Sequence, residues 1–442
     1  MYPIKGKYST AYIMTDETDI DTEAYKQIVS FVNCHVFTND SRIMPDYHAG
    51  AGAVIGFTMS MTDKIIPNVV GVDIGCNMLC ISMQKHFDFD KDQWLAVDRQ
   101  VRKNIPMAQR HHHKPQLDIY KDFPWQLTSL EKDIFTSKLN AYLGTDFKGE
   151  HYTPEWFFDL CKRVNCKPNV AVNSLGSLGG GNHFIEFGVS KKTGHTCCTV
   201  HSGSRNLGLK VANYWQRKAK DNLIQRYQVE FQNKIKEIKE TYPSEQWNDR
   251  IKAAKNPPTP TGLEYLEGED MYGYLHEMNF CQRYAQYNLS MMMTAILQIL
   301  NRPITLMLST DTVHTVHNYI DFEDFIIRKG AVRSIKGQKM IIPFNMEDGL
   351  LICEGKSNEE WNCSAPHGAG RLRPRGELKR DKDIDTRKIR GRMNEKGIYL
   401  SVVPKDEVKE AYKDPKFIEK AIEPTATVVD RIRPVLTLKA DD

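Results

Sequence analysis

Two groups of short apolar runs, broken by glycine, constrain the fold of this chain more than any other feature. The first group spans residues 43–83, where Val, Ile and Met dominate the runs, and the second spans about 170–209. Short apolar runs bounded by glycine turns are typical of buried strands. We therefore expect strands in both groups, including the run IIPNVV at 65–70, and we expect His201 at a strand end.

Residues 209–300 differ, because they form long polar segments with helical periodicity. The sequence NPPTPTG at 256–262 separates two such segments, since Pro and Gly end helices. We expect the methionines at 291–293 to fill the core. Strands are expected again in five later runs, which are ITLML (304–308), AVRSI (331–335), KMIIPF (339–344), GLLICEG (349–355) and PVLTLK (434–439).

The composition limits the class of protein. No apolar run approaches the roughly 20 residues that a membrane span needs, and the first residues lack the apolar core of a signal peptide, so we expect a cytoplasmic protein without membrane contact. The ten cysteines follow no disulfide spacing and are expected to be reduced. A net charge of +4 does not indicate a nucleic-acid binder.

One local segment is basic. Residues 371–392 carry ten Lys or Arg against four acids, which could follow a phosphate backbone or form a solvated loop of mixed charge. Both interpretations stay open.

Asp73 and Cys76 lie three residues apart in the glycine-broken turn of GVDIGCNM. A thiolate is a soft ligand and a carboxylate a hard one, so the pair fits a borderline divalent ion such as Mn, Zn, Fe or Co. A buried cysteine is more often a small apolar residue, and the pair alone is a weak signal.

Three histidines in loop-like contexts strengthen the metal interpretation: His183 in GGGNHFIE, His201 in VHSGSRNLG and His317 in TVHTVHNYID. Together with Asp73 and Cys76 they offer five donors, which are enough for two ions if the sulfur bridges them. We interpret His314 as an ordinary polar residue and the histidines at 111–113 as solvated.

His367 in SAPHGAGR is a candidate nucleophile. The small residues after it let a bulky group approach the backbone, Arg371 offers a bidentate phosphate donor, and a neutral imidazole attacks phosphorus readily. A histidine in a tight turn is the structural alternative. Walker and Rossmann fingerprints are absent, so a nucleotide would bind in another mode.

Nine segments, in this order, resemble the RtcB family of RNA ligases over about residues 43–439. They are MPDYHAGAGAVIGF, GVDIGCNM, GGGNHFIE, HSGSRNLG, VHNY, IRKG, SAPHGAGR, EAYKD and PVLTLK. The resemblance implies an α+β fold in a single large domain, residues 1–442, of mixed β-sheets packed with helices, with a helical insertion around 209–300.

The resemblance implies a ligase that uses GTP and two Mn²⁺ ions to join an RNA 3′-phosphate or 2′,3′-cyclic phosphate to a 5′-hydroxyl, with His367 as the guanylylated nucleophile. One ion would be held by Cys76, His201 and His317, and the other by Asp73, Cys76 and His183. The positions that match guanylate or phosphate contacts are Asn182, Glu186, Arg205, Ala369, Gly370, Arg371, Tyr412 and Lys439. No protein partner is implied.

The sequence departs from the family at PFNMEDGL, residues 343–350, where small and hydroxylic residues are usual. Glu347 and Asp348 would repel a triphosphate unless they face solvent or a cation. Asn77 replaces a glycine, and we expect it to adopt a left-handed backbone. Two rival functions remain: a metal-dependent RNA cyclic phosphodiesterase without ligation, and a non-catalytic RNA-binding scaffold that uses residues 371–392.

Overall fold

The computed structural model describes residues 1–15 and 20–441. Its largest sheet has seven antiparallel strands, in the order β10-β6-β8-β7-β17-β15-β14. They are β10 (Val313–Val316), β6 (Asn77–Ser82), β8 (Thr196–Ser202), β7 (Phe184–Ser190), β17 (Ala426–Leu438), β15 (Leu350–Gly355) and β14 (Lys339–Pro343). Both β6 and β8 are buried along their whole length, which explains why they read as continuous apolar runs.

A second sheet of six strands mixes parallel and antiparallel pairs, in the order β1-β2-β3-β4-β12-β11. They are β1 (Tyr2–Lys5), β2 (Thr10–Ile13), β3 (Ser41–His48), β4 (Ile55–Ser60), β12 (Ile326–Lys329) and β11 (Asn318–Ile320). Two small sheets pair β13 (Ala331–Arg333) with β16 (Ser364–Pro366) and β5 (Lys64–Ile65) with β9 (Leu266–Glu267). The expected α+β class with mixed sheets is confirmed.

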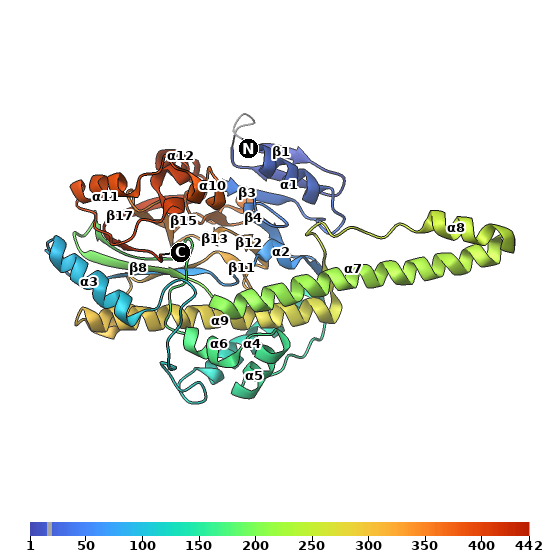
Figure 1. Cartoon of the computed structure of the whole chain (residues 1–442), viewed down its shortest axis with the longest axis horizontal. Helices are drawn as coiled ribbons and strands as arrows, with labels where there is room; N and C mark the ends of the chain where they lie inside the picture. Colours follow the sequence, from blue (N-terminus) through green and yellow to red (C-terminus); the bar gives the residue numbers. More distant parts are fainter. Residues whose placement is uncertain (16–19, 442) are drawn as a thin grey trace.

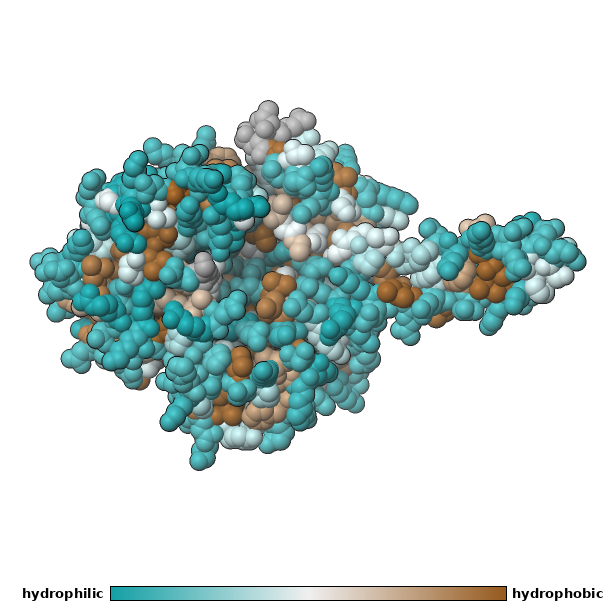
Figure 2. All heavy atoms as spheres, viewed as in Figure 1, coloured by the Kyte–Doolittle hydropathy of each residue, from teal (hydrophilic) through white to brown (hydrophobic). Residues whose placement is uncertain are grey.

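Two long helices, α7 (Arg205–Thr241) and α9 (Gly268–Ile299), lie side by side beneath the sheets (Figure 1). Met292 and Met293 of α9 are buried in the core cluster that also contains Ile81 of β6 and Val200 of β8, as expected for core filler. The distal part of α7 projects from the body together with α8 (Trp247–Ala254), and Figure 2 shows apolar side chains gathered near the tip of this arm.

The other helices pack around the sheets and the two long helices. They are α1 (Thr22–Val32), α2 (Pro67–Val70), α3 (Lys91–Asn104), α4 (Trp125–Leu143), α5 (Pro154–Arg163), α6 (Pro168–Ser174), α10 (Arg375–Arg380), α11 (Thr386–Glu395) and α12 (Pro415–Ala421). Short 3-10 turns are η2 (Ser244–Gln246), η3 (Ile304–Leu308), η4 (Glu359–Trp361), η5 (Lys405–Glu407) and η6 (Lys409–Ala411). Across the described part of the chain, no helix has the length and apolar character needed to cross a bilayer.

Three expected strands are wrong. The run IIPNVV forms the end of β5 and then helix α2, the start of the second group forms α6, and ITLML forms the 3-10 turn η3. In both helices a proline occupies the first turn, where its fixed φ suits a helix and its missing N–H is not needed. Short apolar runs do not distinguish a strand from a buried helix, and here proline decides.

Pro434 shows the opposite case, a proline tolerated inside a long strand. The register of β17 against β7 shifts between Pro434 and Leu436. Proline cannot donate a ladder hydrogen bond, so it is accommodated at such an irregularity. The expected strand PVLTLK is therefore confirmed as the end of β17.

Candidate active site

The metal-donor candidates gather at one end of the seven-stranded sheet. Cys76 directly precedes β6 and His183 directly precedes β7, while His201 lies near the end of the antiparallel strand β8, opposite Met78 and Phe184. His317 is the single residue between β10 of this sheet and β11 of the six-stranded sheet. Antiparallel order thus brings the starts of some strands and the ends of others to the junction of the two sheets.

The turn that carries Asp73 and Cys76 follows helix α2, not a strand, and Gly75 adopts a positive φ of 70° within it. Asn77 does not adopt the expected left-handed backbone. It is the first residue of β6, and its side-chain amide donates to the carbonyl of Gly75 at 2.8 Å. Its side-chain oxygen lies 3.0 Å from Nε2 of His314, so His314 supports the turn without contacting a candidate donor.

All five candidate donors converge. The Sγ atom of Cys76 lies 3.2 Å from Nε2 of His201 and 3.4 Å from Nε2 of His183. Nε2 of His201 is 3.2 Å from Nε2 of His317, and Nε2 of His183 is 3.1 Å from a carboxylate oxygen of Asp73. Cys76, His183 and His201 form a possible metal site, because their ligand atoms lie within 4.8 Å of one another.

The imidazoles and the carboxylate of this cluster suit a cation. Burial and the nearby Asp73 raise the pKa of the Cys76 thiol well above its usual value, so a metal would have to displace the thiol proton. Burial lowers the pKa of His201 and that of His317 well below the usual value, so their rings are neutral. Nδ1 of His183 lies 3.0 Å from the carbonyl of Leu178 and donates to it, so Nε2 is the ring atom that faces Asp73 and Cys76. Although burial opposes ionisation, the contact with His183 lowers the pKa of Asp73 to about 2. A divalent cation bound among these atoms would take the place of the protons that they share.

His367 lies beside this cluster, in the loop that follows β16. Its ring centroid is 5.1 Å from that of His317. Its Nδ1 is 2.7 Å from Oδ2 of Asp46 on β3, and its backbone N–H donates to the same oxygen at 3.2 Å. Asp46 is fully buried, and within the described residues its other oxygen has no hydrogen-bond partner. Asp46 therefore directs its carboxylate to His367 alone.

The glycines after His367 let the loop pack against its neighbours. Gly370 has a positive φ of 74°, and a Cβ there would collide with the backbone of Asp46. A Cβ on Gly368 would lie 3.2 Å from the carbonyl oxygen of Pro343. The small residues thus permit close approach of backbone from β3 and β14.

A cavity of about 390 Å³ connects the donor cluster, His367 and a charged wall from the C-terminal segment. Seven of the eight expected guanylate contacts line it, namely Asn182, Glu186, Ala369, Gly370, Arg371, Tyr412 and Lys439. Arg205 is not among its lining residues. Arg205 donates to Oγ of Ser177 at 3.0 Å and to the carbonyl of Ala108 at 2.7 Å, so its expected phosphate contact stays a prediction.

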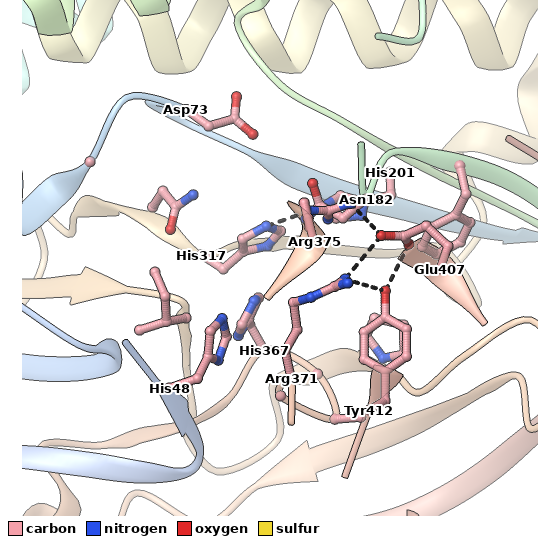
Figure 3. A pocket seen from close by; sticks show the side chains of 18 of the residues that line it. His48, Asp73, Asn182, His201, His317, His367, Arg371, Arg375, Glu407 and Tyr412 are labelled. Atoms are coloured by element: carbon pink, nitrogen blue, oxygen red, sulfur yellow. Dashed lines mark hydrogen bonds and ion pairs between the residues drawn. The ribbon is translucent and has the colours of Figure 1, made fainter. Parts of the chain in front are cut away.

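Glu407 organises the charged wall, as Figure 3 shows for three of its partners. Its carboxylate is 1% exposed. It accepts hydrogen bonds from Lys439 at 2.6 Å, Tyr412 at 2.7 Å, Arg375 at 2.5 Å and Arg371 at 3.1 Å. Burial opposes its ionisation, but the three cations lower the pKa of Glu407 to about 2.

Glu186 also lines the cavity, but its protonation differs from that of Glu407. Burial raises the pKa of Glu186 to about 8, so its carboxyl group is largely protonated at neutral pH. The hydroxyl of Thr437 lies 3.1 Å from Oε2 of Glu186. This end of the cavity therefore offers a neutral acid beside a basic cluster.

Sequence reasoning missed Asp46 and Glu407. Both lie in segments that carry the family resemblance or border it, MPDYH and DEVKEAYKD, but a single carboxylate has no local signal that shows which distant residue it contacts. Only the fold shows which residue each carboxylate contacts. The partner of Asp46, His367, lies 321 residues away in the sequence.

The acids of PFNMEDGL turn away from the cavity. Pro343, Phe344, Asn345, Met346 and Gly349 contribute to its lining, whereas Glu347 and Asp348 do not. Glu347 pairs with Arg392 and, at 2.8 Å, with Lys396, and Asp348 pairs with Lys409 at 3.0 Å. Both acids thus face cations, which removes the expected repulsion of a triphosphate.

Four of the ten cations in the basic segment 371–392 pair with acids of the protein. Arg371 and Arg375 pair with Glu407, Arg373 pairs with Glu377 and Asp381, and Arg392 pairs with Glu347 and Glu410. Arg371 and Arg375 line the cavity, whereas six other cations of the segment are exposed and form no ion pair with the described residues, so both interpretations of the segment stay predictions.

Two smaller expectations can also be checked. Of the histidines at 111–113, only the last is exposed, and Nε2 of His112 lies 3.1 Å from the carbonyl of Gly176, so a fully solvated run is wrong. The ten cysteines are all free, and eight are buried, as expected.

Comparison with known proteins gives the same family as the motifs. The family described as tRNA-splicing ligase RtcB matches residues 27–440. RNA-splicing ligase RtcB of Escherichia coli K12 is 26% identical over 96% of this chain and 96% of its own length. The tRNA-splicing ligase RtcB of Nanoarchaeum equitans is 23% identical over 90% of this chain and 87% of its own length. The chain belongs to the RtcB family.

Proposed function

We propose that this chain is an RNA ligase that joins an RNA 3′-phosphate or 2′,3′-cyclic phosphate to a 5′-hydroxyl, using GTP. The observation that carries the proposal is the Asp46–His367 pair beside the convergent metal donors in one cavity. The names of the relatives from E. coli and N. equitans, RNA-splicing and tRNA-splicing ligase, support RNA as the substrate.

The donor cluster would hold two Mn²⁺ ions. Cys76, His201 and His317 would bind one, and Asp73, Cys76 and His183 the other, with the Cys76 sulfur shared. Their mixture of soft, borderline and hard donors fits a borderline divalent ion. Bound there, the ions would neutralise phosphoryl oxygens and activate water to open a cyclic phosphate.

Asp46 would prepare His367 as the nucleophile. A carboxylate only accepts hydrogen bonds, so the proton of the imidazole lies on Nδ1 and the lone pair lies on Nε2. Nε2 would form a bond to the α-phosphorus of GTP while the bond to pyrophosphate breaks. Asp46 would stabilise the positive charge that the ring acquires during this step.

Two further displacements complete the proposed reaction. An oxygen of the RNA 3′-phosphate would attack the guanylate phosphorus, and His367 would leave. The 5′-hydroxyl would then attack the activated RNA phosphate, expelling GMP and releasing its proton to water. The guanylate would bind at the cavity end formed by Asn182, Glu186, Ala369, Gly370, Arg371, Tyr412 and Lys439, where neutral Glu186 and cationic Lys439 suit the edge of guanine.

We also propose that residues 1–442 act as one ligase domain with residues 209–300 as a helical insertion. In support, one core cluster includes residues of β3, β4, α7 and α9, so the helices are not a separate body. The cytoplasmic location stays a prediction.

The proposal is tested with labelled GTP and Mn²⁺. Wild-type protein should form an adduct that is stable in base and labile in acid, and His367→Ala should abolish it. His111→Ala is the matched control, because His111 does not line the cavity, and it should behave as wild type. Absence of an adduct with every divalent metal tried would refute the proposal.

The rival function is a metal-dependent RNA cyclic phosphodiesterase. Its motivation was the acidic loop, but Glu347 and Asp348 face cations outside the cavity lining. Opening of a cyclic phosphate without GTP, and without a joined product, would select this rival.

A further inference from the structure

The turn between β14 and β15, residues 343–349, forms one wall of the cavity, and we call it the pocket hairpin. It is held together internally. The side-chain oxygen of Asn345 accepts from the backbone N–H groups of Glu347 and Asp348, and the N–H of Phe344 donates to the carbonyl of Gly349. The hairpin is therefore a compact unit at the end of the β14–β15 ladder.

The position of the pocket hairpin bears on His367. The carbonyl oxygen of Pro343 approaches Gly368 so closely that a Cβ there would be 3.2 Å away. Gly368 directly follows His367 in the chain. A displacement of the hairpin would thus reach the loop that presents the imidazole.

Ion pairs hold the side of the hairpin that faces away from the cavity. Oε2 of Glu347 is 2.8 Å from Nζ of Lys396, and Oε1 contacts the guanidinium of Arg392. The side chain of Glu347 is 3% exposed, whereas Arg392 and Lys396 are 40% and 51% exposed. An ionised carboxylate in such a place is stable only while it is paired.

Apolar contacts reinforce the same attachment. Met346 of the hairpin belongs to a cluster that contains Ile389 and Met393 of α11 and Val408. Val408 directly follows Glu407, the centre of the charged wall. The hairpin and the charged wall, which face the same cavity, are thus connected through α11.

We propose that Glu347 is a positioning residue. Its ion pairs with Arg392 and Lys396 hold the pocket hairpin against α11 and so fix the two cavity walls between which the nucleotide binds. Glu347 itself does not line the cavity. We call these two ion pairs of Glu347 the clamp. That the nucleotide is GTP rests on the function proposed above, whereas the existence of the clamp does not depend on that function.

The kinetic test uses Glu347→Gln, which keeps the shape and removes the charge. We expect the KM for GTP in adduct formation to rise about tenfold, with kcat within about threefold, as is typical for mutations that act through a neighbouring element. The double variant Arg392→Gln/Lys396→Gln should show the same rise, and combining it with Glu347→Gln should add less than about twofold. Glu347→Asp keeps the charge and should recover part of the loss.

Asp348→Asn is the matched control, because it neutralises the adjacent acid of the same hairpin. Its ion pair with Lys409 is more exposed, at 28% and 44%, and exposed pairs contribute little. We expect its KM to change by less than about twofold. An equal rise in KM for Asp348→Asn and Glu347→Gln would overturn the proposal, since net charge alone would then explain both.

Amide hydrogen exchange on the nucleotide-free protein tests the clamp separately. Glu347→Gln should speed exchange in residues 344–349 and 386–396 and leave β8 unchanged. Unchanged exchange in both segments would overturn the inference. If wild-type protein forms no adduct but Glu347→Gln still speeds exchange there, the proposed function fails and the clamp stands. Should Glu347→Gln not fold, Lys396→Gln alters a half-exposed side chain and carries the same test.

Discussion

Replacing Asp46 with Asn tests whether this carboxylate activates His367. Asp46 is fully buried, and its Oδ2 takes both the ring Nδ1 contact and the backbone N–H of His367. An amide has nearly the same shape but no charge. We therefore expect Asp46→Asn to slow adduct formation while the fold and the affinity for GTP stay close to wild type.

The magnitude follows from two contributions. A hydrogen bond to a charged group contributes about 1.5–3 kcal/mol, roughly twice that of a neutral bond. The carboxylate also attracts the charge that develops on the ring, by about 4 kcal/mol at 4 Å with an effective dielectric constant of about 20. These estimates overlap, and a loss of about 3 kcal/mol corresponds to a rate about 150-fold slower.

The assay is single-turnover adduct formation with labelled GTP, quenched in base because the P–N bond is acid-labile. Thermal unfolding and equilibrium binding of GTP check that the variant is intact. Asp63→Asn is the control, because Asp63 is 81% exposed and pairs only with Lys64 among the residues described. A rate for Asp46→Asn within about threefold of wild type would refute the proposed activation.

Three further predictions concern the metal cluster, the charged wall and the buried acid beside it. Cys76→Ser should lose both Mn²⁺ ions in elemental analysis, because one sulfur is proposed to serve both, and retention of either ion would contradict that arrangement. Glu407→Gln leaves a buried cationic cluster uncompensated and should lower the free energy of unfolding by about 3 kcal/mol in denaturant titrations; a change below about 0.5 kcal/mol would be inconsistent with its central position. The pKa of Glu186 is raised from 4.5 to about 8 in the folded state, so the folded protein keeps a proton that the unfolded chain loses. The free energy of unfolding should therefore fall as pH rises from about 4.5 to 8, and Glu186→Gln should flatten this slope.

The strands of the sheet centre and the candidate metal donors could be selected from the sequence for different reasons. The strands β6 and β8 are buried throughout and leave long apolar runs between glycines. Cys76 and the histidines stand out because such donors are rare and lie in turns or at strand ends. Their convergence could not be predicted from spacing, since it depends on the antiparallel order of β6, β8 and β7 and on His317 at the crossing between sheets.

The ion pairs between distant charged residues could not be predicted from the sequence. The segment PFNMEDGL placed two acids close to a presumed triphosphate site, and residues 371–392 placed many cations where they could meet RNA. The sequence of a segment gives the sign of each charge but not the direction in which its side chain points. In the folded chain Glu347 lies 45 residues from Arg392 and contacts it, so one acid of the first segment pairs with one cation of the second.

These ion pairs change how the departure from the family should be interpreted. If the acids had faced the cavity, they would have opposed an anionic ligand by direct repulsion, and loss of nucleotide binding would have been the simplest consequence. Because both acids lie outside the lining and pair with cations, they place no unpaired negative charge in the cavity. An acid in this loop therefore has a different effect when it pairs with cations outside the cavity than when it faces the cavity. The sign of its effect on nucleotide affinity follows from where the side chains point.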